Sequence, residues 1–424
     1  MSVRLVRLAR GMDPSLVVIL AGVSAALHVG KLSPALPVLR EALGVTLVQA
    51  GFLLSLVQLA GMALGLAIGL AVDGLGLKRS MISGLLILFA ASVLGGLAQD
   101  VQTLLVLRAV EGFGFLLVSM PAPSLIRHLV SSKRMSAMLG LWGAYMPLGT
   151  ASALLCGPLV IALAGWQVWW WLLAALTLLM AFWLWQVVPP DRVRSAEHTH
   201  QQASHGSDSG EKAATHAWPQ RLRQTLSAPG PWLVALSFAV YSGQWLAVIG
   251  FLPTIYMQAG FAGGMTAVLT ALVAAVNMIG NIASGQLLGR GVRPQMLLYA
   301  GFCVMGLGTL AAFITWPLAP GAEGLPTAIR FVAVLMFSML GGMIPGTLFY
   351  LAVRLAPGEG TVSTTVGWMQ QWASFGQFAG PPLAAWVASG AGGWHWTWVI
   401  TGGCSLVGIL LAQGIRLQLR LRRL

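Results

Sequence analysis

Twelve apolar runs, each long enough to cross a lipid bilayer, constrain this chain more than any other feature of its sequence. A membrane-spanning helix needs about 20 predominantly apolar residues. Within lipid, every backbone N–H and C=O group needs an internal partner, so such runs form helices or closed barrels. These runs are continuous rather than alternating, which excludes barrel strands. The sequence therefore predicts an all-α membrane protein with transmembrane helices near residues 15–37, 48–72, 79–98, 102–127, 136–164, 167–188, 232–257, 264–288, 295–316, 326–354, 362–389 and 394–415.

The basic residues gather on one side of the predicted membrane. If the N-terminus is cytoplasmic, 20 of the 24 Lys and Arg residues fall in cytoplasmic segments, and the exceptions are Lys31, Arg40, Arg108 and Arg330. Because Lys and Arg are enriched in cytoplasmic loops, both termini are predicted to be cytoplasmic, in a multi-pass protein of a bacterial inner membrane. The net charge of +13 is thus a signal of topology, and no nucleic-acid partner is expected.

A polar segment divides the chain into three parts, an N-terminal six-helix bundle at residues 1–190, a cytoplasmic linker at 191–228 and a C-terminal six-helix bundle at 229–424. The linker composition favours a solvated flexible loop. Weak metal binding by its histidines is the alternative, which the spacing disfavours: His198, His200, His205 and His216. The three cysteines lie inside predicted helices and offer neither a disulfide framework nor a metal site, so no cofactor is expected.

The two halves are related by an internal repeat. Leu36-Pro37 recurs 216 residues later as Leu252-Pro253, and Arg108 recurs 222 residues later as Arg330. An offset that changes slowly over half the chain is typical of carriers built from two similar bundles, which rock against each other around a site near the middle of the membrane. The sequence therefore predicts a transporter with two pseudo-symmetric bundles.

A short motif in the predicted loop between helices 2 and 3 contains Gly69, Asp73, Gly76, Lys78 and Arg79. It resembles the signature loop of the major facilitator superfamily, although position 74, usually basic there, is Gly here. The resemblance implies a fold of twelve helices in two bundles and a cytoplasmic gate that includes the aspartate. The alternative is that the basic pair only anchors the loop at the inner leaflet.

In predicted helix 4, Arg108 and Glu111 lie three residues apart and therefore share a helix face. The segment from Arg108 to Gly114 resembles the Arg-x-x-Gln-Gly-x-Gly element of proton-linked members of that superfamily, with Glu in place of Gln. Ionisable groups at this depth are costly unless they are paired or face a watery cavity. We therefore expect Glu111 to carry or control a coupling proton, with His28 as its competitor because imidazole titrates near neutral pH. A purely structural ion pair is the alternative.

In the resembled fold, helices 1, 4, 7 and 10 line a central cavity, and six polar residues of this chain belong to those helices. The predicted substrate and proton site therefore consists of His28, Lys31, Arg108, Glu111, Gln244 and Arg330. Alternative roles are packing for His28 and an interfacial anchor for Arg330. Amides on helices 8 and 11 form a predicted secondary lining, with interhelical hydrogen bonding as the alternative role: Asn277, Asn281, Gln370, Gln371 and Gln377.

These features predict a secondary active transporter that moves an anionic or polar organic solute by alternating access, as a proton symporter and as a monomer. Segments around Pro147 and Pro253 resemble the cyanate and nitroimidazole permease branch. The alternative is a proton-driven exporter of drugs or a siderophore-like metabolite. Helix 5 keeps Gly157-Pro158 without the full antiporter element, which helix 11 carries at Gly376–Pro381, and this disfavours an antiporter. No motif of an intramembrane enzyme is present.

Overall fold

The computed structural model of the chain describes residues 13–131, 134, 138, 141–191, 218–316, 323–358 and 361–421. The first half of the chain forms helices that end shortly before the linker. Their bounds are α2 (Pro14–Gly30), α3 (Leu32–Leu43), α4 (Leu47–Ser55), the 3₁₀ turn η1 (Leu56–Gln58), α5 (Leu59–Leu75), α6 (Leu77–Gly95), α7 (Val101–Ser119), α8 (Ala122–Leu129), α10 (Tyr145–Ala164) and α11 (Trp166–Val187).

The short helix α13 (Trp218–Ser227) lies within the predicted linker, and the second half then repeats the pattern of long helices. It contains α14 (Pro229–Gln258), α15 (Gly263–Gly289), α16 (Pro294–Phe313), β1 (Thr315–Trp316), β2 (Glu323–Gly324), α17 (Thr327–Gly341), α18 (Met343–Leu355), α19 (Val362–Gly390), η3 (Trp394–Trp396) and α20 (Thr397–Leu421). The strands form one two-residue antiparallel ladder, which does not change the all-α class.

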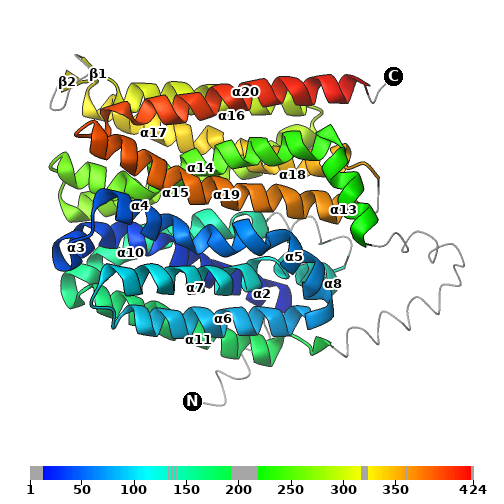
Figure 1. The fold of residues 1–424 in the computed structure, drawn as a ribbon, viewed down its shortest axis with the longest axis horizontal. Helices are drawn as coiled ribbons and strands as arrows, with labels where there is room; N and C mark the ends of the chain where they lie inside the picture. The colour runs from blue at the N-terminus through cyan, green and yellow to red at the C-terminus, as the bar shows by residue number, and fades with distance from the viewer. Residues whose placement is uncertain are drawn as a thin grey trace, which may run out of the picture.

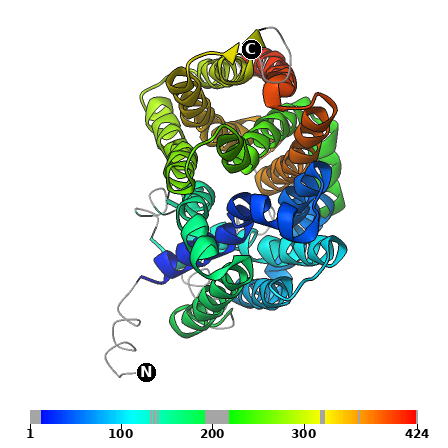
Figure 2. The same ribbon diagram turned by 90° about the vertical axis from the view of Figure 1, so that its left-hand side faces the viewer.

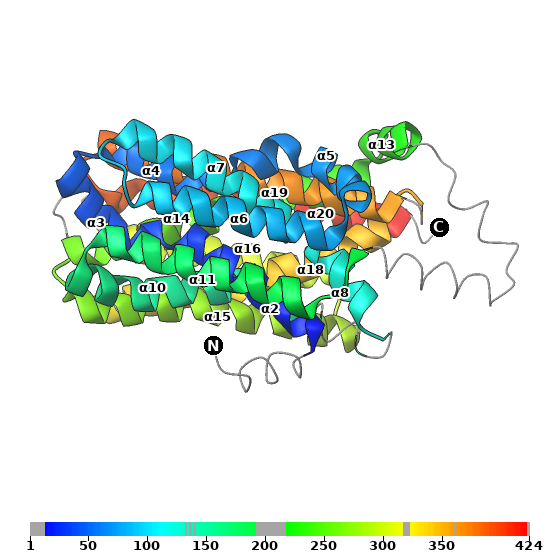
Figure 3. The same ribbon diagram turned by 90° about the horizontal axis from the view of Figure 1, so that it is seen from below.

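The helices of the two halves form two groups that lie side by side (Figure 1), and α10 of the first group packs on α15 of the second. The beginning of α2 and the helices α8 and α13 lie toward one end of the molecule, which we call the linker end (Figure 3). The β1–β2 ladder and α3 lie at the opposite end, which we call the hairpin end and which faces the viewer in Figure 2.

Hydropathy predicted the long helices well. Among the described residues, eleven helical segments are long and apolar enough to cross a membrane. The remaining predicted segment, 362–389, forms α19, which has 29 residues but is less apolar because it carries glutamines and two prolines. Twelve long helical segments therefore match the twelve predicted spans, although part of the fifth span, before residue 141, lies outside the described residues.

Proline breaks two helices at matching positions of the repeat. Proline has no N–H group, so the carbonyl four residues earlier in the helix loses its partner. Pro123 lies just beyond the turn at Met120 that separates α7 from α8, and Pro345 lies just beyond the turn at Gly342 that separates α17 from α18. Pro123 and Pro345 are 222 residues apart, and so are Met120 and Gly342, which supports the predicted internal repeat.

Helices α14 and α19 lie in backbone contact because small residues face each other. A Cβ added at Gly376 would overlap the carbonyl oxygen of Ala239, and one at Gly380 would overlap the carbonyl oxygen of Gly243. Membrane helices approach each other this closely where small residues are spaced four apart. The Gly-x-x-x-Gly-Pro segment of helix 11, which resembles an antiporter element, thus joins two helices of the second half.

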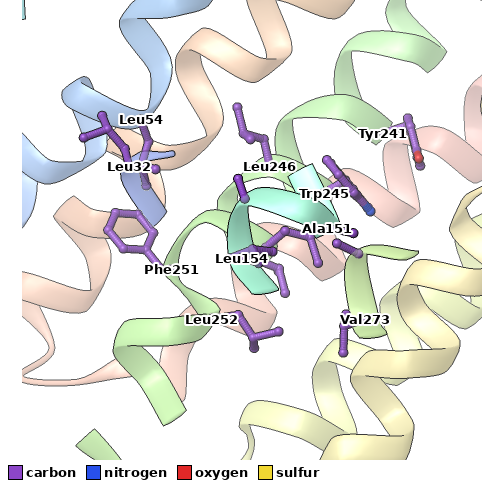
Figure 4. Close-up of a cluster of buried hydrophobic side chains, with 14 of the residues drawn as sticks. Leu32, Leu54, Ala151, Leu154, Tyr241, Trp245, Leu246, Phe251, Leu252 and Val273 are labelled. Carbon is purple, nitrogen blue, oxygen red and sulfur yellow. The ribbon is translucent and has the colours of Figure 1, made fainter. Parts of the chain in front are cut away.

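At the hairpin end, apolar side chains from both halves form one cluster (Figure 4). Leu32 and Leu54 of the first half and Phe251 and Leu252 of the second half belong to it, and all four are at most 1% exposed. Gly250 of α14 also lies against Leu54, where an added Cβ would be 3.0 Å from its Cδ1. The two halves are therefore joined by dry packing on this side.

Candidate functional site

Four of the six predicted site residues form one buried charged cluster in the first half of the chain. His28 lies in the last turn of α2, Lys31 lies in the turn between α2 and α3, and Arg108 and Glu111 lie on α7. Lys31 Nζ forms an ion pair with Glu111 Oε1, and Arg108 Nη1 lies 2.5 Å from Glu111 Oε2. Each of the four side chains is at most 1% exposed, so in this conformation they do not line an open cavity.

Partners from the outer helices of the first half hold Lys31 in place. Its ammonium group donates to Ser92 Oγ on α6 at 3.0 Å and lies 4.7 Å from the centre of the Trp170 ring on α11. Ser92 in turn donates to the carbonyl of Trp170 at 2.9 Å. A cation over an indole ring is stabilised by the ring's electron density, more so where water is excluded. The cluster therefore faces the interior of the first bundle.

The hydrogen bonds around His28 indicate a neutral ring. Thr177 donates its hydroxyl proton to the carbonyl of Leu173 at 2.8 Å, so its oxygen accepts from His28 Nε2 at 2.8 Å. The other ring nitrogen, Nδ1, lies 3.3 Å from Lys31 Nζ, which can only donate. His28 thus carries its proton on Nε2 and accepts at Nδ1.

Arg108 connects three elements. Its Nη1 donates to the carbonyl of His28 at 2.8 Å, and its Nε donates to the carbonyl of Leu53 at 3.0 Å, one turn before η1 interrupts the second span. Its Nη2 is buried and has no hydrogen-bond partner among the residues that the structure describes. A guanidinium presents several donors in a fixed plane, and here one of them is still available for a ligand.

With His28 neutral, the cluster holds two basic side chains, Lys31 and Arg108, and one carboxylate, Glu111. Removing charges from water is expensive, and a buried ion is tolerated when it is paired and hydrogen-bonded. Glu111 is paired with Lys31 and Arg108 at the same time. The site therefore has a surplus of one positive charge, which favours an anion near the unused Arg108 nitrogen.

The structure does not bring the other two predicted cavity residues to this cluster. Gln244 on α14 accepts through Oε1 from Ser405 Oγ of α20 at 3.1 Å, so it faces the interior of the second half. Arg330 on α17 lies near the hairpin end, where its Nε donates to the carbonyl of Ala312 at 2.6 Å.

The predicted amides on α15 belong to an uncharged polar group in the second half. Asn277 Nδ2 donates to the hydroxyl of Tyr241 at 3.1 Å and to the carbonyl of Ser338 at 2.8 Å. Asn281 donates to Asn277 Oδ1 at 3.1 Å, and Trp245 donates to Ser338 Oγ at 3.1 Å. This group joins α14, α15 and α17 through hydrogen bonds alone.

One of the three predicted glutamines of α19 lies where the two halves meet. Gln371 Oε1 accepts from the backbone N–H of Leu66 on α5 at 3.1 Å, whereas Gln370 and Gln377 are half-buried on the same helix. Gln58, in η1, also faces α19, because its Oε1 lies 3.4 Å from Ser374 Oγ. Interhelical hydrogen bonding accounts for Gln371 in this conformation.

The structure describes only part of the loop motif. The Asp73 side chain lies outside the part of the chain that the structure describes, although the α5 backbone runs through Gly69 and Asp73 to Leu75, so the gating role of Asp73 stays a prediction. Gly76 has a φ of 88°, which glycine adopts without strain, and a Cβ there would lie 2.6 Å from Asp191 Oδ2.

Two ionic groups of this region sit at helix ends. Asp191 accepts from the backbone N–H groups of Lys78 at 3.0 Å and Arg79 at 3.3 Å, at the beginning of α6. The Lys78 ammonium donates to the carbonyl of Trp185 at 2.7 Å and to that of Val188, at the end of α11. A carboxylate at a helix N-terminus and an ammonium at a C-terminus both complement the helix dipole. The motif thus joins α6 to α11 at the linker end.

Sequence reasoning missed the partners that complete these sites. Ser92, Thr177, Gln58 and Asp191 were not expected to take part, and each was visible only as a polar residue near or within an apolar segment. The Lys31–Glu111 pair was also not expected, since it depends on how α2 packs against α7. Polar residues in lipid-spanning segments are the signal that would have found three of them.

Comparisons with known proteins agree with this architecture. The family model described as Major Facilitator Superfamily matches residues 16–376. The chain is 26% identical over 393 residues to the 2-nitroimidazole transporter of Escherichia coli (strain K12), which covers 90% of this chain and 88% of that protein. This match confirms the resemblance to the nitroimidazole permease branch.

Two further relatives match over a shorter part of their own length. Identity is 28% over 267 residues to the probable sulfoacetate transporter SauU of Cupriavidus necator, with 61% of this chain and 60% of that protein covered. Identity is 26% over 333 residues to human solute carrier family 2, facilitated glucose transporter member 10, with 73% of this chain and 59% of that protein covered. The chain therefore spans less than two thirds of both proteins.

Solved structures share the fold at low identity. A bacterial homologue of the human lysosomal transporter Spinster, inward-facing and unoccupied, has a TM-score of 0.73 at 16% identity and covers 95% of both chains. The same homologue, inward-facing and occupied, has a TM-score of 0.74 and covers 95% of this chain and 96% of that one.

Proposed function

The chain belongs to the major facilitator superfamily, and we propose that it is a secondary active transporter that imports a small organic anion together with protons. Residues 1–190 and 229–424 act as the two bundles, and 191–228 links them. The bundles rock against each other so that a site near the middle of the membrane faces each side in turn. The transporter acts as a monomer.

One observation carries this proposal, the buried cluster of Lys31, Arg108, Glu111 and His28. Its surplus positive charge and the unused Arg108 Nη2 favour a substrate with a negatively charged group. The name of one relative supports the same class, because sulfoacetate carries a sulfonate and a carboxylate. The other relatives are named for uncharged or weakly charged solutes, and a polar neutral substrate is the second candidate.

Proton coupling is proposed from the position of Glu111. Both of its oxygens pair with cations, which come from different elements. When α2 moves relative to α7, the carboxylate loses the Lys31 ammonium and takes up a proton instead, so that the buried charge stays balanced. Substrate binding at Arg108 and proton binding at Glu111 would then occur in one connected network.

Flux measurements in liposomes test the proposed activity. Purified protein in liposomes that are acidic outside should accumulate radiolabelled sulfoacetate, or another small organic anion from a panel, and a protonophore should collapse the accumulation. Empty liposomes give the background, and 2-nitroimidazole and glucose serve as uncharged comparisons. Uptake of no anion of the panel under any gradient would contradict the proposal, and uptake that ignores the pH gradient would contradict its coupling.

We also propose that the protein lies in a bacterial inner membrane with the linker end in the cytoplasm. Single cysteines introduced at positions 205 and 360 should react with a membrane-impermeant maleimide only after the inner face is exposed. One at position 323 should react in intact cells, because the charge distribution of the loops places it outside. Labelling of positions 205 and 323 from the same side would overturn this topology.

A further inference from the structure

A pocket at the hairpin end of the second half is separate from the charged cluster. Its volume is about 200 Å³, and its lining comes from α14, α15, α16 and α17 and from the turn between α14 and α15. Ala259, Gly260 and Thr327 on its rim are exposed, so it communicates with the surface. An apolar cavity of about 150 Å³ already holds a benzene molecule, so this pocket has room for a molecule with one aromatic ring.

Most of the pocket wall is apolar and aromatic. Phe261, Phe313 and Phe331 line it together with Leu252 and Val334. Tyr256 lies beside Phe261, with a ring-to-ring distance of 5.5 Å. This wall favours the apolar part of a small molecule, and a ring in particular, because aromatic faces and edges pack well against each other.

Arg330 contributes the charge of the pocket. Its Nε donates to the carbonyl of Ala312 in the last turn of α16 at 2.6 Å, and its side chain lines the pocket. Among the described residues, its two terminal nitrogens have no hydrogen-bond or ion-pair partner. A guanidinium fixed at one nitrogen with two others free matches the two oxygens of a carboxylate or sulfonate.

Two further features of the pocket suit an anion. The hydroxyl of Tyr256 is buried and has no hydrogen-bond partner among the described residues, so it is available to donate. Thr327 begins α17, a helix of 15 residues, and the free N–H groups and the dipole at such an N-terminus favour negative charge. Three kinds of donor thus belong to one pocket, and none of its lining residues in the described part of the chain is a carboxylate.

We infer that this pocket binds a small organic anion with an apolar body, such as an aromatic carboxylate, through Arg330 and Tyr256. The ligand enters from the side of the hairpin end. The site is distinct from the Lys31–Arg108–Glu111 cluster, so it does not depend on which solute the protein carries.

Fluorine NMR with 4-fluorobenzoate as the probe tests this inference on the full-length purified protein in nanodiscs of phosphatidylcholine. The wild type should broaden the probe signal in a saturable way, and uncharged 4-fluorobenzamide should not compete. Arg330→Gln should weaken binding roughly ten-fold or more and Tyr256→Phe by a few-fold, since bonds to an ionised group are the stronger kind. Arg40→Gln is the matched control, because Arg40 lies at the hairpin end of the first half and also donates its Nε to a carbonyl, that of Val45.

A distance-dependent measurement distinguishes binding in this pocket from binding at the Lys31–Arg108–Glu111 cluster. A nitroxide attached at Leu325→Cys should strongly relax the bound probe, whereas one at Glu41→Cys, also at the hairpin end, should not; both are placed in protein whose three native cysteines are replaced by serine. Equal binding by wild type and Arg330→Gln, equal competition by the benzamide, or equal relaxation from both labels would overturn the inference. Loss of probe binding when phosphatidylglycerol replaces phosphatidylcholine, at a salt concentration that screens the surface charge, would also overturn it, because a lipid headgroup would then occupy the pocket.

Discussion

Replacing Glu111 with glutamine should abolish proton-driven accumulation of substrate while leaving exchange of substrate across the membrane. Glutamine keeps the size of the side chain but cannot take up a proton, so coupling is lost even if the substrate still binds at Arg108. The measurement is uptake into liposomes with and without an imposed pH gradient, together with counterflow of labelled substrate without a gradient. We expect His28→Gln to alter mainly the substrate affinity, because His28 binds Thr177 and Lys31 as a neutral ring.

Stability has to be separated from coupling in this experiment. Glu111→Gln leaves Lys31 and Arg108 buried without their carboxylate, and breaking a buried ion pair costs about 3–5 kcal/mol. The double variant Lys31→Met with Glu111→Gln keeps the net charge of the cluster and should restore the yield of folded protein. It should still fail to accumulate substrate. If the folded double variant concentrates substrate and His28→Gln does not, His28 carries the proton and Glu111 has only a structural role.

Gly376→Ala should be the most damaging single methyl group that can be added to α19. The new Cβ would overlap the carbonyl oxygen of Ala239. The Cβ is fixed to the backbone of α19 and the oxygen belongs to the backbone of α14, so neither atom can move aside without moving its helix. Overpacking of this kind typically costs about 1–3 kcal/mol, and more where backbone has to shift. Thermal unfolding of the purified protein, followed by tryptophan fluorescence, should show a melting temperature several degrees lower.

Gly403→Ala is the control for this substitution. Gly403 lies within α20 and is exposed, and a Cβ there would meet no atom within 4 Å. Alanine is favoured over glycine in a helix interior by about 1 kcal/mol, so this variant should melt at the wild-type temperature or slightly above it. Equal melting temperatures for Gly376→Ala and the wild type would show that α14 and α19 are not in backbone contact.

The sequence predicts the helices because their signal is local. Each span is recognisable from its own apolar residues, and the breaks at Met120 and Gly342 follow from a proline three residues later. The repeat offset of Arg108 and Arg330 also correctly places them in related helices. However, the two arginines have different surroundings, since one lies in the charged cluster and the other in the hairpin-end pocket.

The site could be predicted only in part, because it depends on tertiary contacts between helices. Spacing places Arg108 beside Glu111 and His28 beside Lys31 on their own helices, but it cannot say that Lys31 reaches Glu111 across 80 residues. Gln244 was placed in the cavity from its repeat position, whereas its rotation about α14 turns it toward Ser405. Asp191 was read as part of the linker because a helix cap is recognisable only when the capped helix is adjacent in sequence.

The uneven charge of the two halves has an electrical consequence. The first half carries one surplus positive charge in its cluster, whereas the polar group around Asn277 in the second half is uncharged. Moving one elementary charge through the whole of a 100 mV membrane potential changes its free energy by about 2.3 kcal/mol. In the proposed symport a monoanion binds together with a proton at Glu111, so the two add no net charge and the loaded carrier keeps the surplus. The voltage across the membrane then acts equally on the loaded carrier and on the return of the empty one, and the complete cycle moves no net charge.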